Sequence, residues 1–361
     1  MIDSYIKTED PMQKIWSFFH YYQNEPNVKA LLLERYKAFP DIQEEKQALR
    51  LAYENTHKLI YFLKQGVAYF KSAKESEFIV RPLLLYYGVT SLMKAVILIN
   101  DPFYPRTTAV LQHGITTRKK KKLHYQFLLD EIKVQRDGLL PLFAEMTLTS
   151  SLKVHSKFKV RELLSMVPEL QDIYTRKTGE QTLLPVHITE QPLPVTTTAS
   201  LILEDRQAAT ANMWELRFIP DKKEGITQTE FESLTDLFVV GLSEHESLLH
   251  SDQRTFSLHF ESKNPLFTPL QHPQICRNSD GSFFFYTKGT LRISDELVVI
   301  NMLSYLLGML CRYDTELWGE LVFSFSSSDT YLIEEILQLI LRKFPNLVLN
   351  QIYQQNLIFI P

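Results

Sequence analysis

Glycine is scarce in this sequence, and the glycine-rich motifs that hold phosphates are missing. The chain has 11 glycines among 361 residues, whereas about 7% is usual. Neither G-x-G-x-x-G nor G-x-x-x-x-G-K-[ST] occurs, which excludes the standard dinucleotide and P-loop sites. The motifs G-x-S-x-G and H-E-x-x-H are missing too, so the common hydrolase and zinc-protease signatures are lacking. The sequence therefore predicts no catalytic residues of these kinds.

Cysteine is equally rare, and no metal-binding pattern accompanies it. Cys276 and Cys311 are the two cysteines of the chain. Two cysteines cannot form a disulfide framework, so a reducing compartment, the cytoplasm, is the expected location. His245, His250 and His259 do not suggest a metal site, because residues five apart do not share a helix face. We expect no metal and no cofactor.

Strong net charge and an uninterrupted apolar span are also missing. The net charge is −3, which gives no general attraction to nucleic acid or to an anionic membrane. The first ten residues are polar and do not have the apolar segment of a signal peptide. The most apolar stretch, residues 78–99, is interrupted by Arg81 and Lys94, whereas a membrane span needs about 20 mainly apolar residues. We expect a buried helix there and no membrane association.

The spacing of apolar residues predicts a mainly α protein with a smaller β-containing portion, an α+β fold. Apolar residues recur every three or four positions from Leu49 to Phe70, which is typical of an amphipathic helix. Residues 77–99 are apolar on nearly every face, so this helix should lie at the centre of a bundle. The expected helices are 12–22, 44–72, 77–99, 123–134, 229–242, 297–310 (capped by Ser294) and 331–344. The expected strands are 201–203, 213–219, 256–260 and 283–286.

The order of these elements predicts three regions. Residues 1–138 form an N-terminal helical region, residues 139–290 a mixed α/β region, and residues 291–361 a C-terminal helical region. The first and the last are expected to pack into one helical body with the mixed region as an insertion.

Three residues are candidates for contact with an anionic ligand: Arg81, Lys94 and His113. An arginine at the head of a buried helix must reach water or pair with an anion. A histidine beside Gly114 suits a loop that contacts a ligand. The alternatives are an internal salt bridge from Arg81 to a glutamate and an ordinary loop histidine at position 113.

Arg106 and His113 permit a catalytic interpretation. Their separation resembles the R-x4–6-H signature of the HEPN superfamily of helical nucleases and nucleotide-binding modules. In such a site the arginine stabilises the pentacovalent phosphate and the histidine transfers a proton. That signature belongs within a helix, whereas Pro105 and Gly114 favour a loop.

A run of five cations follows this segment, formed by Arg118, Lys119, Lys120, Lys121 and Lys122. Such runs are usually solvated surface. The functional alternative is a salt-dependent contact with RNA or another phosphate-bearing ligand. Because no aromatic residues are interleaved in the run, a base-stacking platform is missing.

The sequence resembles the YaaC-like proteins of Bacillus and related bacteria over nearly its whole length. The segments that carry this resemblance are 81–88 (RPLLLYYG), His113-Gly114, 307–313 (LGMLCRY), Trp318-Gly319 and 343–350 (KFPNLVLN). The resemblance implies a bacterial cytoplasmic protein. Genes of this family often adjoin that of IMP dehydrogenase, which implies a link to purine nucleotide metabolism or a direct partnership with that enzyme.

The leading hypothesis is therefore a non-enzymatic binding or regulatory protein. It would act on a purine-nucleotide enzyme such as IMP dehydrogenase and respond to a purine nucleotide. The alternatives are a HEPN-like RNA-cleaving nuclease that uses Arg106 and His113, and a nucleic-acid-binding protein that uses residues 118–122.

Overall fold

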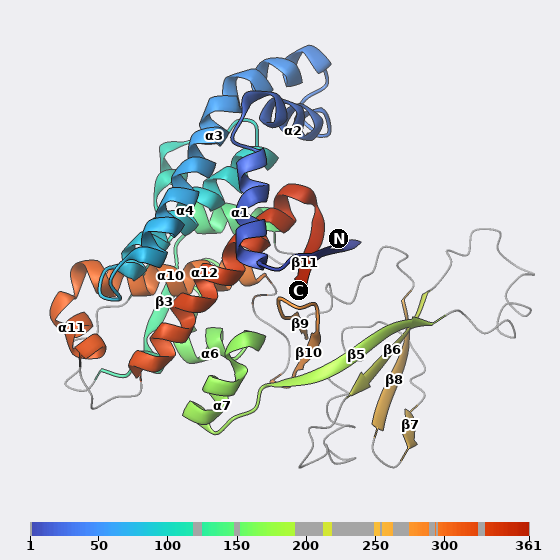
Figure 1. Cartoon of the computed structure of the whole chain (residues 1–361), viewed down its shortest axis with the longest axis vertical. Helices are drawn as coiled ribbons and strands as arrows, with labels where there is room; N and C mark the ends of the chain where they lie inside the picture. Colours follow the sequence, from blue (N-terminus) through green and yellow to red (C-terminus); the bar gives the residue numbers. More distant parts are fainter. Residues whose placement is uncertain are drawn as a thin grey trace, which may run out of the picture. The chain divides into compact units, whose positions relative to one another are not determined.

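A computed structural model shows a mainly α-helical protein with a smaller β portion (Figure 1), as the sequence predicts. It describes residues 2–117, 125–147, 152–191, 212–218, 249–252, 255–262, 274–288, 293, 295–323 and 329–360. The chain divides into two compact units, residues 1–163 with 295–361 and residues 164–294. The predicted boundaries at residues 138 and 290 stay a prediction.

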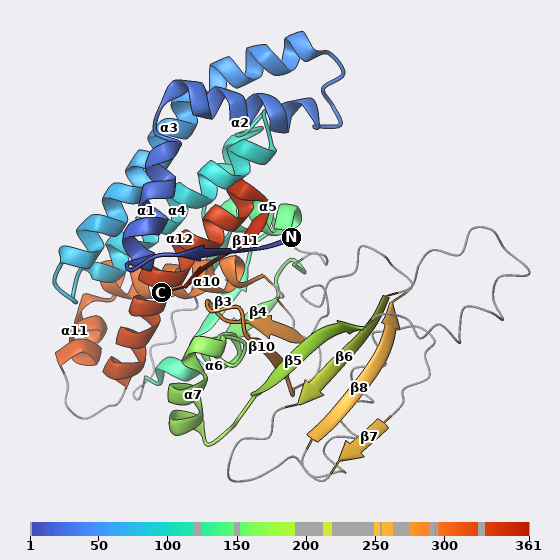
Figure 2. The same cartoon turned by 45° about the vertical axis from the view of Figure 1, so that its right-hand side comes forward.

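The first unit is a helical bundle to which both ends of the chain contribute. Its described helices are α1 (Pro11–Tyr21), α2 (Glu25–Lys37), α3 (Glu45–Glu75), α4 (Arg81–Asn100), α5 (Leu139–Thr147), α10 (Glu296–Tyr313), α11 (Thr315–Phe323) and α12 (Asp329–Tyr353). Figures 1 and 2 both show α3 beside α4. The N-terminal end of α3, which packs against α2, projects from the bundle.

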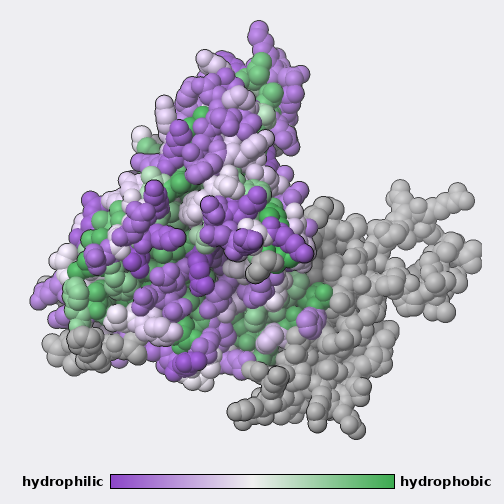
Figure 3. Space-filling model, in the orientation of Figure 1, coloured by the Kyte–Doolittle hydropathy of each residue, from purple (hydrophilic) through white to green (hydrophobic). Residues whose placement is uncertain are grey.

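Helix α4 is the centre of this unit. It packs against α3, α10, α12, α2 and α5, and most residues from Leu85 to Ile99 are buried, whereas Tyr87, Thr90 and Lys94 are half-buried along one face. By length and composition α4 and α10 could each cross a membrane, but 72% and 83% of their most apolar windows lie inside the protein. The prediction of a buried central helix over residues 77–99 is confirmed. On the face shown in Figure 3, hydrophilic residues cover most of the coloured surface of the helices.

Two glycines bring α3 and α4 into close contact. A Cβ atom at Gly88 of α4 would lie 2.7 Å from Cδ2 of Phe70, and a Cβ atom at Gly66 of α3 would lie 2.5 Å from Cδ2 of Leu92. Each helix thus presents a glycine to a large side chain of the other. This arrangement fills the contact without voids, which favours both helices because buried side chains lose dispersion energy next to a gap.

The first unit also contains two small sheets. β1 (Ile2–Lys7) pairs in parallel with β11 (Gln355–Ile360), with Ile2 opposite Gln355 and Lys7 opposite Ile360. β2 (Ile115–Thr117), β3 (Glu131–Val134) and β4 (Lys157–Lys159) form an antiparallel sheet in the order β2-β3-β4.

The second unit contains an antiparallel sheet, visible in Figure 2. Its strand order is β7-β8-β6-β5-β10-β9. The strands are β5 (Leu183–Gln191), β6 (Asn212–Phe218), β7 (Leu249–Asp252), β8 (Thr255–Ser262), β9 (Ile275–Arg277) and β10 (Phe283–Tyr286). Helix α6 (Val160–Leu164) lies at the boundary of the units, and α7 (Gln171–Thr178) belongs to the second.

Three details of the expected secondary structure were wrong. Residues 125–134, the described part of the predicted helix 123–134, do not form an α-helix: β3 occupies Glu131–Val134, where buried Ile132 and Val134 alternate with less buried neighbours and pair with β2 and β4. Asp295, not Ser294, caps α10 by accepting the Leu297 N–H at 2.8 Å. The last helix does not end at residue 344 but continues through Pro345 to Tyr353, because burial of its second half outweighs a proline cost of about 3 kcal/mol.

The other predicted elements are found where the structure describes them. Helices 12–22, 44–72, 77–99 and 297–310 correspond to α1, α3, α4 and α10, and strands 213–219, 256–260 and 283–286 correspond to β6, β8 and β10. The predicted strand 201–203 and helix 229–242 lie outside the described residues.

The α3–α4 contact predicts opposite effects of alanine at two helical glycines. Gly88→Ala forces a methyl group against the Phe70 ring and should lower the free energy of unfolding by about 1–3 kcal/mol. Gly319→Ala on α11 meets no atom within 4 Å, so it should raise that free energy by about 0.5–1 kcal/mol through helix propensity. Denaturant unfolding of both variants measures the difference. Equal effects would show that close packing does not matter at Gly88.

Candidate functional site

Two tyrosines meet where α4 and α10 run antiparallel. The rings of Tyr86 and Tyr305 lie edge to face with centroids 5.5 Å apart. Gly308 makes this approach feasible, because a Cβ atom there would lie only 3.0 Å from Cβ of Tyr86. Burial raises the pKa of both tyrosines. Their hydroxyl groups are therefore neutral at physiological pH and act as hydrogen-bond donors and acceptors.

His113 packs against these two tyrosines from a neighbouring loop. Its ring centroid lies 5.4 Å from that of Tyr86 and 5.4 Å from that of Tyr305. Its Nδ1 atom is hydrogen-bonded to the Tyr86 hydroxyl. When the Tyr86 hydroxyl donates this bond, the neutral imidazole keeps its N–H at Nε2, which has no hydrogen bond to any residue that the structure describes.

Backbone contacts fix the loop that carries His113. Gly114 has φ +79°, and Gly138 packs so closely on it that a Cβ atom at Gly138 would lie 2.2 Å from the Gly114 Cα. The N–H of Leu140 donates to the His113 carbonyl at 3.2 Å, and the N–H of Gln135 donates to the Gly114 carbonyl at 2.8 Å. The imidazole is therefore positioned by the start of α5, although the loop itself is not regular structure.

The positive charges of Arg312 and Lys94 act on His113. Burial lowers the pKa of Lys94. The pKa of His113 is lowered from 6.5, first by burial and then by the charges of Arg312 and Lys94. Arg312 donates from Nη1 to the Tyr87 hydroxyl at 3.1 Å and lies 4.9 Å from the centroid of the Tyr313 ring. We call Lys94, His113 and Arg312, with Tyr86 and Tyr305, the cationic cluster.

The cationic cluster lacks a counter-charge within the described residues. No described carboxylate forms an ion pair with Lys94, His113 or Arg312. A half-buried lysine without a partner is unfavourable, since burial disfavours its charged form. An ammonium, a guanidinium and an N–H donor beside aromatic rings form an arrangement that can bind a phosphate or carboxylate group.

Arg81 also belongs to α4, but its guanidinium contacts the C-terminal end of α3. Thirteen residues, about 20 Å of helix, separate it from Lys94 along α4. Its Nε donates to the Ala73 carbonyl at 3.1 Å and its Nη2 to the Ser76 carbonyl at 2.8 Å, so it completes the C-terminus of α3. In the described part of the chain Arg81 has no ion pair with a glutamate. Its contact with a ligand stays a prediction.

Arg106 has surroundings different from those of His113. It forms a two-point ion pair with Asp101, with N···O distances of 2.8 Å and 3.0 Å. Its guanidinium also lies 5.4 Å from the ring centroid of Phe103. Between Arg106 and His113 the chain forms a 3-10 turn, Thr108–Leu111, and not an α-helix. No hydrogen bond or ring contact of the described residues joins the two side chains.

The remaining candidates give less information. Residues 118–122, the basic run, and His245 lie outside the described residues. Among the described residues, no group of three or more His, Cys, Asp and Glu side chains could hold a metal ion.

Sequence reasoning found two members of the cluster and missed three. Lys94 and His113 were candidates, and the structure brings them together. Tyr86, Tyr305 and Arg312 were not, because their proximity depends on the antiparallel packing of α4 and α10. Tyr86 and Arg312 nevertheless lie within segments 81–88 and 307–313, which carry the family resemblance.

Fold and cluster together describe an α+β protein whose central helices bring two tyrosines to a loop histidine. The sequence model described as YaaC-like Protein matches residues 20–352, nearly the whole chain. The chain therefore belongs to the YaaC-like family, as the resemblance predicted. No curated protein and no solved structure matches the chain.

The cationic neighbours of His113 predict a measurable pKa change. Replacing Arg312 or Lys94 by methionine should raise the pKa of His113, because each removes a charge that disfavours the imidazolium. The matched control is Lys71→Met, at an exposed position of α3, which should leave the pKa of His113 unchanged. Histidine NMR titration measures the pKa. An unchanged value in both variants would show that the charges do not interact.

The same pKa predicts how stability depends on pH. Because the folded pKa of His113 lies below the unfolded value of about 6.5, the unfolded chain binds the proton first. This histidine therefore lowers the free energy of unfolding as pH falls below about 6.5, until the folded pKa is passed. Comparing unfolding of the parent and His113→Gln across this range isolates its contribution, which should be absent in the variant.

Proposed function

We propose that the protein is a non-enzymatic binding or regulatory protein of the cytoplasm, and that its cationic cluster binds an anionic ligand. The observation that carries the proposal is the combination of Lys94, Arg312 and His113 without a described counter-charge. The absence of the common catalytic motifs from the sequence agrees with a binding role.

The partial burial of Lys94 favours the binding of an anion. The lowered pKa of Lys94 shows that its charged form is disfavoured by burial. A bound phosphate or carboxylate would reverse this effect and raise the pKa of Lys94 and of His113 together. Hydrogen bonds from charged donors contribute about 1.5–3 kcal/mol each, so a ligand that engages two of these groups would bind with useful affinity.

A purine nucleotide is the ligand class that the surroundings favour. The phosphate would contact the cations, and the half-buried ring of Tyr87 offers aromatic surface for a base, because Tyr86 and Tyr305 are only 3% and 6% exposed. Stacking of a base on an aromatic ring contributes about 1–3 kcal/mol. The family resemblance adds IMP dehydrogenase, an enzyme of purine nucleotide metabolism, as the proposed partner.

The nuclease alternative finds no supporting contact. Its arginine, Arg106, is paired with Asp101, and its histidine belongs to the cationic cluster. The nucleic-acid-binding alternative depends on residues 118–122, which lie outside the described residues. We therefore retain the nucleotide-responsive binding protein as the single proposal.

Thermal unfolding against IMP, GMP, GTP, ATP and guanosine tetraphosphate tests the ligand. A nucleotide present at about 100 times its dissociation constant should stabilise the folded protein by about 2.7 kcal/mol. Lys94→Met and Arg312→Met should each weaken binding about tenfold or more, the equivalent of about 1.4 kcal/mol, while Lys71→Met should bind normally. If no nucleotide shifts the transition, or if the shift survives both cluster variants, the proposed site is wrong.

The proposed partner is tested with purified IMP dehydrogenase. The two proteins should form a complex at physiological salt, measured by sedimentation, and the ligand identified above should change its dissociation constant. Ligand and partner affinities must change by the same factor, because allosteric coupling is reciprocal. Lys94→Met should abolish the nucleotide effect and leave binding without nucleotide unchanged. Failure to detect any complex would remove this enzyme as the partner.

A further inference from the structure

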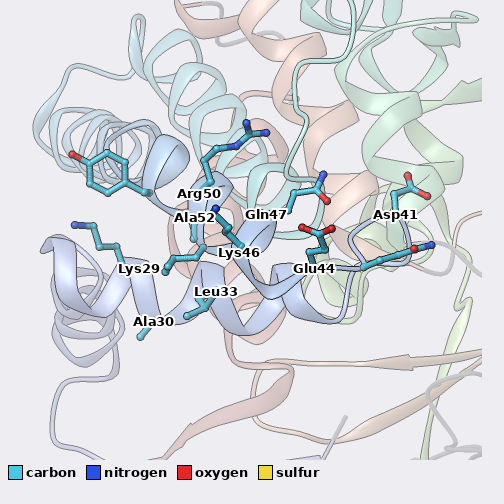
Figure 4. Close-up of a pocket in the computed structure, with 12 residues that line it drawn as sticks. Lys29, Ala30, Leu33, Asp41, Glu44, Lys46, Gln47, Arg50 and Ala52 are labelled. Atoms are coloured by element: carbon cyan, nitrogen blue, oxygen red, sulfur yellow. The ribbon is translucent and has the colours of Figure 1, made fainter.

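A groove lies between α2 and α3, far along the projecting part of the helical unit (Figures 1 and 4). It has a volume of about 1130 Å³ and is lined only by residues of α2, α3 and the segment between them. Its apolar lining comes from Ala30 and Leu33 of α2 and from Leu49, Ala52 and Tyr53 of α3. None of these residues belongs to the cationic cluster.

Helix α3 continues this apolar surface as an exposed stripe. Leu49, Tyr53 and Tyr61 are 57%, 67% and 64% exposed. They are spaced by four or eight residues, with His57 between the tyrosines, so they lie on one face of the helix. Large apolar side chains that gather on one face, unlike those scattered singly, indicate an interaction surface.

Helix α2 is apolar on two faces, which is an independent sign of a missing neighbour. Val28, Leu32 and Tyr36 are buried inside the unit. Ala30 and Leu33 instead line the groove. A helix that packs on one side alone has a single apolar stripe. The second apolar face of α2 therefore indicates a second packing partner.

Charges of opposite sign lie toward opposite ends of the groove. In Figure 4 the cations Lys29, Arg50 and Lys46 lie to the left of the anions Glu44 and Asp41. Lys29 and Arg50 form surface ion pairs, to Glu25 at 3.4 Å and to Glu54 at 3.7 Å, and the Lys29 ammonium also lies 4.8 Å from the ring centroid of Tyr53. Such pairs contribute little, about 0–1 kcal/mol, so these cations are available to a partner.

We propose that a second copy of the chain occupies this groove. Two α2–α3 hairpins related by a twofold axis form a four-helix bundle, which buries Leu49 and Tyr53 of both copies. With the twofold axis perpendicular to the grooves, each groove is antiparallel to the other, so that Lys29 and Arg50 of one copy face Asp41 and Glu44 of its partner. An isologous contact needs this self-complementarity, and a groove with one sign of charge would not provide it.

The oligomeric state tests the proposal, measured by sedimentation equilibrium over a range of concentrations. The parent chain should be a dimer. Leu49→Asp combined with Tyr53→Asp should be a monomer with unchanged helical circular dichroism, because it places charge in the bundle core. The matched control is Tyr331→Asp, an exposed tyrosine of α12 that is 57% exposed, and it should remain a dimer.

Charge reversal tests the antiparallel arrangement itself. Lys29→Glu with Arg50→Glu should raise the dimer dissociation constant about tenfold or more, because like charges then face each other. Adding Asp41→Lys and Glu44→Lys to the same chain should restore the dissociation constant of the parent dimer, since the charges of the groove are again self-complementary. A monomeric parent, or a dimer indifferent to both sets of variants, overturns the proposal.

The two proposals fail separately. Lys94→Met and Arg312→Met should keep the dimer intact, and the monomeric Leu49/Tyr53 variant should still bind the nucleotide. Loss of nucleotide binding with an intact dimer counts against the cationic cluster alone. An unaltered nucleotide response in a chain that never dimerises counts against the groove alone.

Discussion

The close approach of α3 and α10 to α4 is the constraint on which the helical unit depends. Gly66 and Gly88 allow α3 and α4 to interlock with Leu92 and Phe70, and Gly308 allows α10 to approach Tyr86. A single added methyl group at these contacts would require a shift of packed side chains, since protein interiors have few voids. Because α4 also contacts α12 and α2, a displacement at one contact affects the others.

The cationic cluster is a consequence of this packing. Tyr86 can meet Tyr305 and His113 only because Gly308 presents no side chain to it. Burial lowers the pKa of the imidazole, and the charges of Arg312 and Lys94 lower it further. Elsewhere in the same unit, buried Lys343 is paired with Glu296 at 2.7 Å. The charge of Lys343 is therefore neutralised within the fold, whereas Lys94 has no described carboxylate partner.

Two surfaces of the unit therefore suit two different kinds of partner. The cationic cluster has charge of one sign beside aromatic rings, which suits a small anionic ligand. The α2–α3 groove has both signs of charge and a broad apolar lining, which suits a protein surface. Their residues do not overlap, so ligand binding and self-association can be altered independently. If ligand binding and self-association are coupled, a structural change at the cationic cluster would have to reach the groove along α3 and α4, which run side by side (Figure 2).

Local sequence patterns determined the long helices, because a period of three or four residues and the cap residues are properties of neighbouring positions. The α+β class, the buried α4 and strands such as β8 followed from such patterns, as did the selection of Lys94 and His113. Residues 123–134 were misjudged because β3 exists only through its pairing with β2 and β4, which are distant in the sequence. For the same reason Tyr86, Tyr305 and Arg312 could not be assigned to one site. Periodicity specifies which face of α4 and α10 is apolar, but only tertiary packing decides which residues meet across the two helices, and hence where the charges remain without a partner.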